Sequence, residues 1–357
     1  MSKFFNPKLF VLGAFGYKDN QLDGQTIKTR SIYNLLIGRF HGKVAKIDTL
    51  DVKEAPWKMV NIVYHLLTCN TLVIMPSYNN FTYLFPVCYI LSLIFRYDII
   101  LICIGGRQTE YFSGQEKFSP HKLQLYCSKR IKVFMPEMEI ENSNLITKFH
   151  FKNTVVLPNF RKFENRSFTP IFHDELKMVF MGRIIIEKGF PVIFDALDKL
   201  EKKGLKVNMV FYGQIGDKDK NLFLTLIRKY RHIASYEGWL NPEDIQRTLS
   251  QFDLMLLPTQ HFTEGFPGSI LDAYISGIPV IVTEWKYSRE FVTDGKTGFI
   301  IPYSGESEDL AKSIHILCKN RDKLLQMKRF AYEERKKYSE DVAWNILKKY
   351  IGLCSDF

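Results

Sequence analysis

Two carboxylates enclose a short turn in the stretch Glu264-Gly265-Phe266-Pro267-Gly268-Ser269-Ile270-Leu271-Asp272, and this turn opens a predicted helix. An apolar strand, Leu254–Pro258, precedes the stretch, and a second apolar run, Gly277–Val282, follows it. This order places acids and free backbone N–H groups at the carboxyl end of a sheet, where open α/β folds bind ligands. A phosphate-bearing sugar has the matching chemistry.

Short apolar strands alternate with helices on both sides of this stretch. In the N-terminal half, we expect strands at 10–13, 44–47, 71–75 and 99–104 and helices at 26–40 and 81–95, and residues 133–135 and 153–157 extend the strand pattern. In the C-terminal half, we expect strands at 177–181, 207–212, 254–257, 279–283 and 295–301, helices at 191–203, 221–230 and 242–251, and further helices between 307 and 350. Uninterrupted apolar strands separated by helices indicate parallel sheets covered on both faces.

The chain is long enough for two domains. It has 357 residues, about twice the usual domain size. A polar, proline-bearing segment, Pro158–Glu175, reads as the connection between the halves. We therefore predict an α/β fold of two tandem Rossmann-like, doubly wound domains that face each other across a cleft. Their boundaries are 1–160 and 161–357, and the last helix is a candidate to pack back on the first domain.

The net charge and the cysteine spacing indicate which ligands and metals the chain can bind. The formal net charge is +11, which suits phosphate-rich ligands or an anionic membrane, although lysine-rich runs mixed with acids are also typical of solvated helix faces. The six cysteines show no C-x-x-C spacing and no paired histidines, so we expect free thiols in a reducing cytoplasm and no zinc site.

The segment Met59–Phe95 contains no Asp, Glu, Lys or Arg. Prolines and asparagines interrupt it, and its apolar part, Phe81–Phe95, is shorter than the roughly 20 residues that a spanning helix needs. We expect a soluble or peripheral protein. Two interpretations of Phe81–Phe95 stay open: a buried crossover helix, or a helix that seats the protein on a membrane surface.

Two cations lie in a second informative segment, which runs from Gly182-Arg183 to Lys188-Gly189 between a predicted strand and a helix. Arg183 as a fork and Lys188 as a point charge, beside a helix N-terminus, can neutralise a diphosphate. The alternative is that both are ordinary surface cations. It is less favoured because the Glu264 segment follows this segment in the chain, in the order expected for a donor-binding site.

Together these segments resemble family 4 of the retaining glycosyltransferases, of the type found in surface-polysaccharide biosynthesis, which have the GT-B fold. The likeness covers the second domain and is looser in the first. It implies that Arg183 and Lys188 bind the donor diphosphate and stabilise the leaving group, and that Glu264 contacts hydroxyls of the transferred sugar. The resemblance also implies that Asp272 binds the ribose of the nucleotide. The family usually has Glu at this position, and the Asp side chain is shorter by one C–C bond. Other donor-binding positions implied are Gly182, Gly265, Phe266, Pro267, Gly268 and Ser269.

The first domain contributes weaker candidates. Gly24 and Gln25 resemble the family's glycine-rich loop that faces the donor phosphates, although a simple helix-entry turn is the alternative. On the acceptor side, Gly105, Gly106 and Arg107 follow a predicted strand, at a place where many relatives carry a catalytic histidine. All eight histidines are interpreted as structural.

The resemblance implies transfer of a sugar from a nucleotide diphosphate sugar with retention of configuration. UDP is the first choice of nucleotide and GDP the second. The acceptor is a glycan, with a polyprenyl-diphosphate-linked one as an option. We expect no metal, no further cofactor and no nucleic-acid partner, and a location in the cytoplasm or at the inner face of the cell membrane. The alternatives are another GT-B enzyme, such as a nucleotide-sugar epimerase or a phosphorylase, and a non-catalytic glycan- or polyanion-binding protein.

Overall fold

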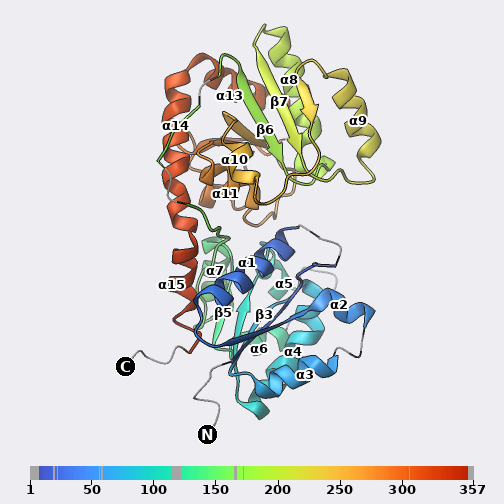
Figure 1. Ribbon diagram of the computed structural model, residues 1–357, viewed down its shortest axis with the longest axis vertical. Coiled ribbons are helices and arrows are strands. Elements are labelled where there is room, and N and C mark those ends of the chain that lie inside the picture. Colours follow the sequence, from blue (N-terminus) through green and yellow to red (C-terminus); the bar gives the residue numbers. More distant parts are fainter. Residues whose placement is uncertain are drawn as a thin grey trace. The chain divides into compact units, whose positions relative to one another are not determined.

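The computed structural model describes residues 8–352 apart from residues 19–20, 22, 56, 58, 115–121, 165–166, 172 and 305. The chain forms two compact units (Figure 1). Unit 1 comprises Met1–Arg161 and Ser339–Phe357, and unit 2 comprises Lys162–Tyr338. The C-terminal segment thus belongs to unit 1 rather than to the second half of the chain. The reason is apolar burial, because its helix α15 (Glu340–Leu347) places Ala343 and Leu347 in the core of unit 1.

Unit 1 contains a five-stranded parallel sheet in the order β2-β1-β3-β4-β5. The strands are β1 Lys8–Gly13, β2 Lys43–Asp48, β3 Thr71–Met75, β4 Asp98–Ile102 and β5 Val133–Met135. β2 pairs with one side of β1 and β3 with the other, so the strand order reverses between β1 and β3. Such a switch point opens a crevice at the carboxyl ends of the strands.

Helices cover both faces of this sheet. They are α1 Gly24–Arg39, α2 Thr49–Glu54, α3 Met59–Thr68, α4 Tyr78–Phe95, α5 Gln108–Phe112, α6 Lys122–Ser128 and α7 Glu139–Phe149, together with α15. Side chains alternate along β1, so Phe10 and Leu12 join a core with α3, α4 and α6, whereas Leu9 and Val11 join a second core with α1 and α15. Both faces are therefore buried, as the uninterrupted apolar strands predicted.

Unit 2 contains a six-stranded parallel sheet in the order β11-β10-β9-β6-β7-β8. The strands are β6 Leu176–Met181, β7 Val207–Tyr212, β8 Ala234–Tyr236, β9 Leu254–Leu257, β10 Val280–Thr283 and β11 Gly298–Ile301. The helical segments are η2 Ile186–Lys188, α8 Phe190–Lys202, α9 Lys220–Lys229, α10 Ile245–Leu249, α11 Gly268–Ile275, α12 Ser288–Phe291, α13 Ser307–Lys319, α14 Arg321–Glu334 and η3 Arg335–Tyr338. β6 and β9 are hydrogen-bonded parallel neighbours, so the loops that follow them leave the sheet at the same edge.

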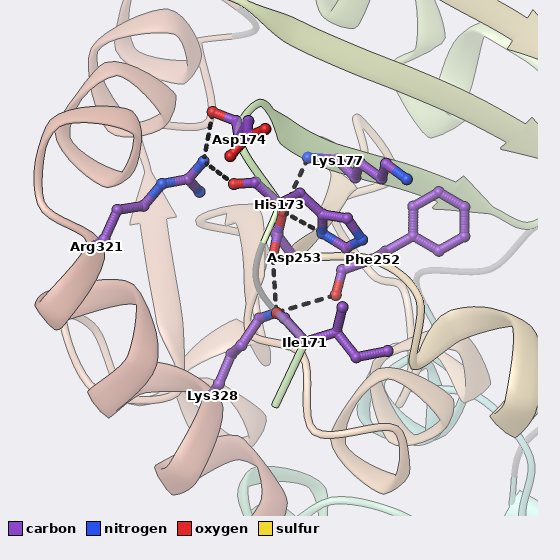
Figure 2. Close-up of polar contacts among 8 residues, drawn as sticks. All are labelled: Ile171, His173, Asp174, Lys177, Phe252, Asp253, Arg321 and Lys328. Atoms are coloured by element: carbon purple, nitrogen blue, oxygen red, sulfur yellow. Dashed lines mark hydrogen bonds and ion pairs between the residues drawn. The ribbon is translucent and has the colours of Figure 1, made fainter. Parts of the chain in front are cut away.

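Asp253, immediately before β9, is a buried anchor of unit 2 (Figure 2). Its carboxylate lies 2.7 Å from the ammonium of Lys328 on α14 and 3.1 Å from the ring Nδ1 of His173, and it accepts the backbone N–H of Lys177 at 3.0 Å. Burial lowers the pKa of Lys328, and the charge of Asp253 opposes that shift. This network ties the chain before β6 to α14, and it gives His173 a structural contact.

Some predicted elements differ from the structure. Residues 153–157 form only an isolated bridge, between Phe134 and Thr154, instead of a strand. β8 and α3 were not predicted, because β8 is only three residues long and α3 lies in a segment without charged residues to mark a polar face. Within the described residues, Cys69, Cys88, Cys103 and Cys127 are buried free thiols and Cys318 is a half-buried one, while Cys354 lies outside the described residues. None of the described helices is both long and apolar enough to cross a bilayer.

Candidate functional site

Two loops of unit 2 leave neighbouring strand ends. One runs from Met181 at the end of β6 to Phe190 at the start of α8, and the other runs from Leu257 at the end of β9 to Gly268 at the start of α11. Since β6 and β9 are adjacent and parallel, both loops emerge at the carboxyl edge of the sheet. A backbone hydrogen bond joins them, from the N–H of Gln260 to the carbonyl of Glu187 at 2.7 Å.

Lys188 and Glu264, predicted from separate segments, form an ion pair across these loops. Their side chains are only 15% and 11% exposed. The second carboxylate oxygen of Glu264 accepts a hydrogen bond from the hydroxyl of Thr259 at 2.8 Å. The pair is therefore held in a fixed, largely desolvated position, and Thr259 is a member of the site that the sequence reasoning missed. Its position two residues after the end of β9 was the available signal.

Gly189 makes this close approach possible. It has a φ of +81°, and an added Cβ would lie 1.9 Å from the carbonyl oxygen of Pro258. Any side chain would push the two loops apart, so only glycine fits there. Gly189 is also the N-cap of α8, so Lys188 stands immediately before the N-terminus of a helix whose first N–H groups have no partner within the helix.

The remaining residues predicted in unit 2 fall into exposed and buried groups. Arg183 is exposed, at the start of its loop, and among the described residues it forms no ion pair with Glu264. Phe266 is buried with its ring stacked on Phe291 at 4.0 Å, so its backbone rather than its ring is available to a ligand. Asp272, on α11, is 8% exposed, which places it in the buried part of that helix instead of on an open face. Gly182, Gly265, Gly268 and Ser269 are half-buried and Pro267 is buried.

The candidates of unit 1 lie in or beside segments that line a pocket of about 130 Å³. Gln25 lines it, next to Gly24 at the start of α1. Gly105, Gly106 and Arg107 do not line it, but the residues on either side of them, Ile104 and Gln108, do. The pocket also contains Pro76, Ser77, Tyr78, Phe81, Leu101, Cys103, Tyr111 and Phe134. Gln108 is the residue missed here, although it follows directly on the predicted acceptor-side run.

Across the part of the chain that the structure describes, no three His, Cys, Asp or Glu side chains gather in a way that would hold a metal ion. The charged groups on the two loops include the Lys188–Glu264 pair and the exposed Arg183 and Glu187.

Residues 161–334 match the family model described as Glycosyl transferases group 1. The chain carries a group 1 glycosyltransferase domain. The matched residues nearly coincide with unit 2, which holds the Lys188–Glu264 pair. The predicted resemblance to this class of glycosyltransferases is confirmed at the level of the domain.

Curated proteins similar to this chain include the capsular polysaccharide biosynthesis glycosyltransferase CapM of Staphylococcus aureus, 22% identical over 286 residues, which cover 72% of this chain and 71% of CapM. WcaL of Salmonella typhimurium, named for colanic acid biosynthesis, is 29% identical over 133 residues, but the match covers only 36% of this chain and 32% of WcaL. The match to WcaL therefore spans about a third of the length of that protein.

Solved structures match along nearly the whole chain. HepE of Anabaena, solved in complex with UDP and glucose, has a TM-score of 0.71 and 15% identity, with 96% of this chain and 99% of HepE covered. The sucrose-phosphate synthase of Thermosynechococcus elongatus has a TM-score of 0.72 and 13% identity, with 97% and 98% covered. The predicted GT-B fold class is confirmed.

Proposed function

We propose that this protein transfers a sugar residue from a nucleoside-diphosphate sugar, with UDP as the nucleotide, to a glycan acceptor in surface-polysaccharide biosynthesis. The observation that carries the proposal is the meeting of Lys188 and Glu264 from two loops at adjacent strand ends inside a group 1 domain. A cation for phosphate and an anion for sugar hydroxyls then stand side by side. The names of the polysaccharide-biosynthesis relatives and the UDP complexes of a structural neighbour support the substrate classes.

Lys188 has hydrogen-bonding capacity to spare for a diphosphate. An ammonium has three N–H donors, and Glu264 uses one of them in this structure. The others, together with the N-terminus of α8 and the exposed guanidinium of Arg183, can stabilise the negative charge that develops on the leaving diphosphate. Glu264 retains lone pairs on both oxygens for sugar hydroxyls, because Lys188 and Thr259 each use one.

The reaction breaks the bond between the anomeric carbon and the diphosphate oxygen and forms one to an acceptor hydroxyl oxygen. In the proposed retaining course both events occur on the same face of the sugar. The departing phosphate takes the acceptor's proton, so no side chain is assigned as a general base and no metal ion is assigned a role.

The test is release of nucleoside diphosphate from a panel of UDP- and GDP-sugars, with and without glycan acceptors. Lys188→Ala should lower turnover by at least about 100-fold, the usual cost of losing one donor that stabilises transition-state charge. The control is Lys206→Ala, an exposed lysine elsewhere in unit 2. Near-normal turnover in Lys188→Ala would overturn the assignment. Proton NMR of the product reports whether the anomeric configuration is retained.

The same panel separates the alternatives. An epimerase would convert the nucleotide sugar without releasing the nucleotide, and a phosphorylase would require inorganic phosphate. A non-catalytic polyanion-binding protein would leave every nucleotide sugar intact and would bind polyanions with a steep salt dependence.

We also propose that unit 1 docks on an anionic membrane. The support is a set of exposed apolar side chains on three helices, here named the apolar surface. They are Met59, Val60, Val63, Tyr64 and Leu67 of α3, Tyr83, Val87, Ile90, Leu93 and Ile94 of α4, and Leu123 and Tyr126 of α6. α3, α4 and α6 join the same core on one face of the sheet, and Gln124 on α6 donates to the carbonyl of Thr82 on α4 at 2.8 Å.

α4 is half core and half surface. Phe81, Phe85 and Cys88 are buried, whereas Leu93 and Ile94 are each 64% exposed. The interpretations of this segment as a covering helix and as a surface-seated helix are thus compatible.

Cations stand beside the apolar surface, with Arg96 and Arg130 exposed at its edge. Apolar side chains flanked by cations are the pattern that binds anionic lipid surfaces. An acceptor linked to polyprenyl diphosphate would be found at such a surface, on the cytoplasmic side of the cell membrane in this proposal.

Co-sedimentation with phosphatidylglycerol-containing vesicles tests this part. The double variant Leu93→Glu/Ile94→Glu should lose at least about 10-fold in partitioning, since each change removes an apolar group and adds repulsion. Ile316→Glu, on an exposed apolar residue of α13, is the control. Wild-type protein that fails to bind these vesicles would refute the proposal. A concentration-dependent dimer abolished by the double variant would assign the apolar surface to a second copy instead.

A further inference from the structure

The pocket of unit 1 lies where a parallel sheet binds ligands. It is lined by residues that follow β3, by the end of β4 and the residues after it, and by Gln25 at the start of α1. These are the carboxyl ends of strands beside the switch point between β1 and β3. The group 1 match begins only at residue 161, so the pocket lies outside the matched domain.

Aromatic side chains make most of the pocket apolar. Phe134 is fully buried, Tyr111 is 3% exposed and Phe81 is 8% exposed, and the three rings belong to one contact network. The volume of about 130 Å³ is slightly below the roughly 150 Å³ of a cavity that binds benzene. The pocket therefore accepts a substituent of a sugar rather than a whole hexose ring.

Two polar atoms in this lining lack a hydrogen-bond partner within the described residues, namely Nε2 of Gln25 and Oε1 of Gln108. Gln108 is only 7% exposed. Its Nε2 donates to the carbonyl of Gly105 at 2.9 Å, which fixes which end of the amide is left unmatched. A buried polar atom without a partner destabilises a protein by about 1–3 kcal/mol, so each of these two atoms needs a partner, which an ordered water or a polar group of a ligand can supply.

Two glutamates support the segment around Gln108, the first residue of α5. Glu137 accepts the N–H of Gly105 at 3.1 Å, and Glu141 accepts the N–H of Thr109 at 2.8 Å. Glu137 is itself paired with the buried Lys28 at 2.7 Å. The unmatched oxygen of Gln108 is therefore held in place before any ligand arrives, which is how a selective binding site is built.

We propose that this pocket binds the acetamido group of an N-acetylated amino sugar in the acceptor. The acetamido carbonyl accepts from Nε2 of Gln25, its N–H donates to Oε1 of Gln108, and its methyl group contacts the aromatic rings. A plain hydroxyl could satisfy a polar atom but would leave the apolar part of the pocket unfilled. The role of this sugar as the acceptor rests on the proposed function, whereas the binding of the acetamido group does not.

The test is direct binding to the full chain by saturation-transfer NMR and calorimetry, without any donor. The methyl glycoside of N-acetylglucosamine should bind at least about 10-fold more tightly than those of glucose and glucosamine, with the strongest saturation transfer at the acetyl methyl. Equal binding of the three sugars, or no transfer to that methyl, would overturn the inference, and this measurement needs no variant.

Variants locate the effect. Gln108→Leu should abolish the preference for the acetylated sugar. Gln124→Leu is the matched control, because Gln124 is also buried with an unmatched Oε1 in the described structure but does not line the pocket. A preference retained in Gln108→Leu would refute the site. Selective binding without sugar transfer would leave this inference standing and refute the proposed function. Sugar transfer together with equal binding of the acetylated and plain sugars would do the reverse.

Discussion

Glu264→Gln removes the negative charge opposite Lys188 while nearly preserving the shape of the side chain. An exposed ion pair is worth at most about 1 kcal/mol, whereas removing one partner of a buried pair costs about 3–5 kcal/mol. The two side chains are 11% and 15% exposed, and Thr259 can still donate to the new amide oxygen. We therefore expect a loss of about 2–4 kcal/mol, which for a unit of this size lowers the melting midpoint by roughly 4–16 °C.

Thermal melts followed by circular dichroism measure this loss. Glu187→Gln, an exposed glutamate one residue before Lys188, is the control and should melt within about 1 °C of the wild type. The double variant Lys188→Met/Glu264→Met should recover most of the stability, because an apolar pair removes the unpaired charge. A Glu264→Gln protein that melts like the wild type, or a double variant no better than Glu264→Gln, would refute the reasoning.

Three further changes test other parts of the fold. Gly189→Ala places a Cβ 1.9 Å from the carbonyl oxygen of Pro258, so a thermal melt should show a far larger loss than for Gly204→Ala, which has a left-handed φ in open space and should lose about 1–2 kcal/mol; equal losses would contradict the close approach. Asp253→Asn leaves a buried lysine without its counter-charge and should cost about 3–5 kcal/mol in urea unfolding, and an unchanged midpoint would show that the network of Figure 2 contributes little. Burial raises the pKa of Cys88 from 9.0 to about 12, so the thiol ionises in the unfolded protein first, and the stability present below pH 9 falls by up to about 1.4 kcal/mol per pH unit as the pH rises toward 12. Cys88→Ala should flatten that part of the pH profile of stability, and a variant profile parallel to that of the wild type would contradict this prediction.

Sequence periodicity predicted most of the fold because the central strands, such as β1, β3, β9 and β10, are buried on both faces. The run Thr71–Met75 matches β3 residue for residue, since all five positions are apolar or small and all five are buried. Several short elements were missed, and so was the 11-residue helix α7. β8 has three residues, of which only Ala234 is buried, so neither length nor pattern distinguished it from a loop.

The candidate site was predictable in part for a similar reason. Lys188 and Glu264 are separated by 76 residues, and only the order of strands, with β9 inserted beside β6, brings them together. The burial of Asp272 was not predictable from helical spacing, because α11 is buried on almost every side and offers no broad open face. The amide atoms of Gln25 and Gln108 became informative only once the structure showed which polar atoms lack partners in the described residues.

The central claim is that Lys188, at the N-terminus of α8, holds the diphosphate of the donor. Calorimetric titration with UDP, in the absence of acceptor, tests it most directly. The account predicts that Lys188→Ala weakens UDP binding by about 10- to 100-fold, as expected for loss of a hydrogen bond to a charged group, while Lys206→Ala stays within about two-fold of the wild type. Equal UDP affinity in the wild type and Lys188→Ala would contradict it.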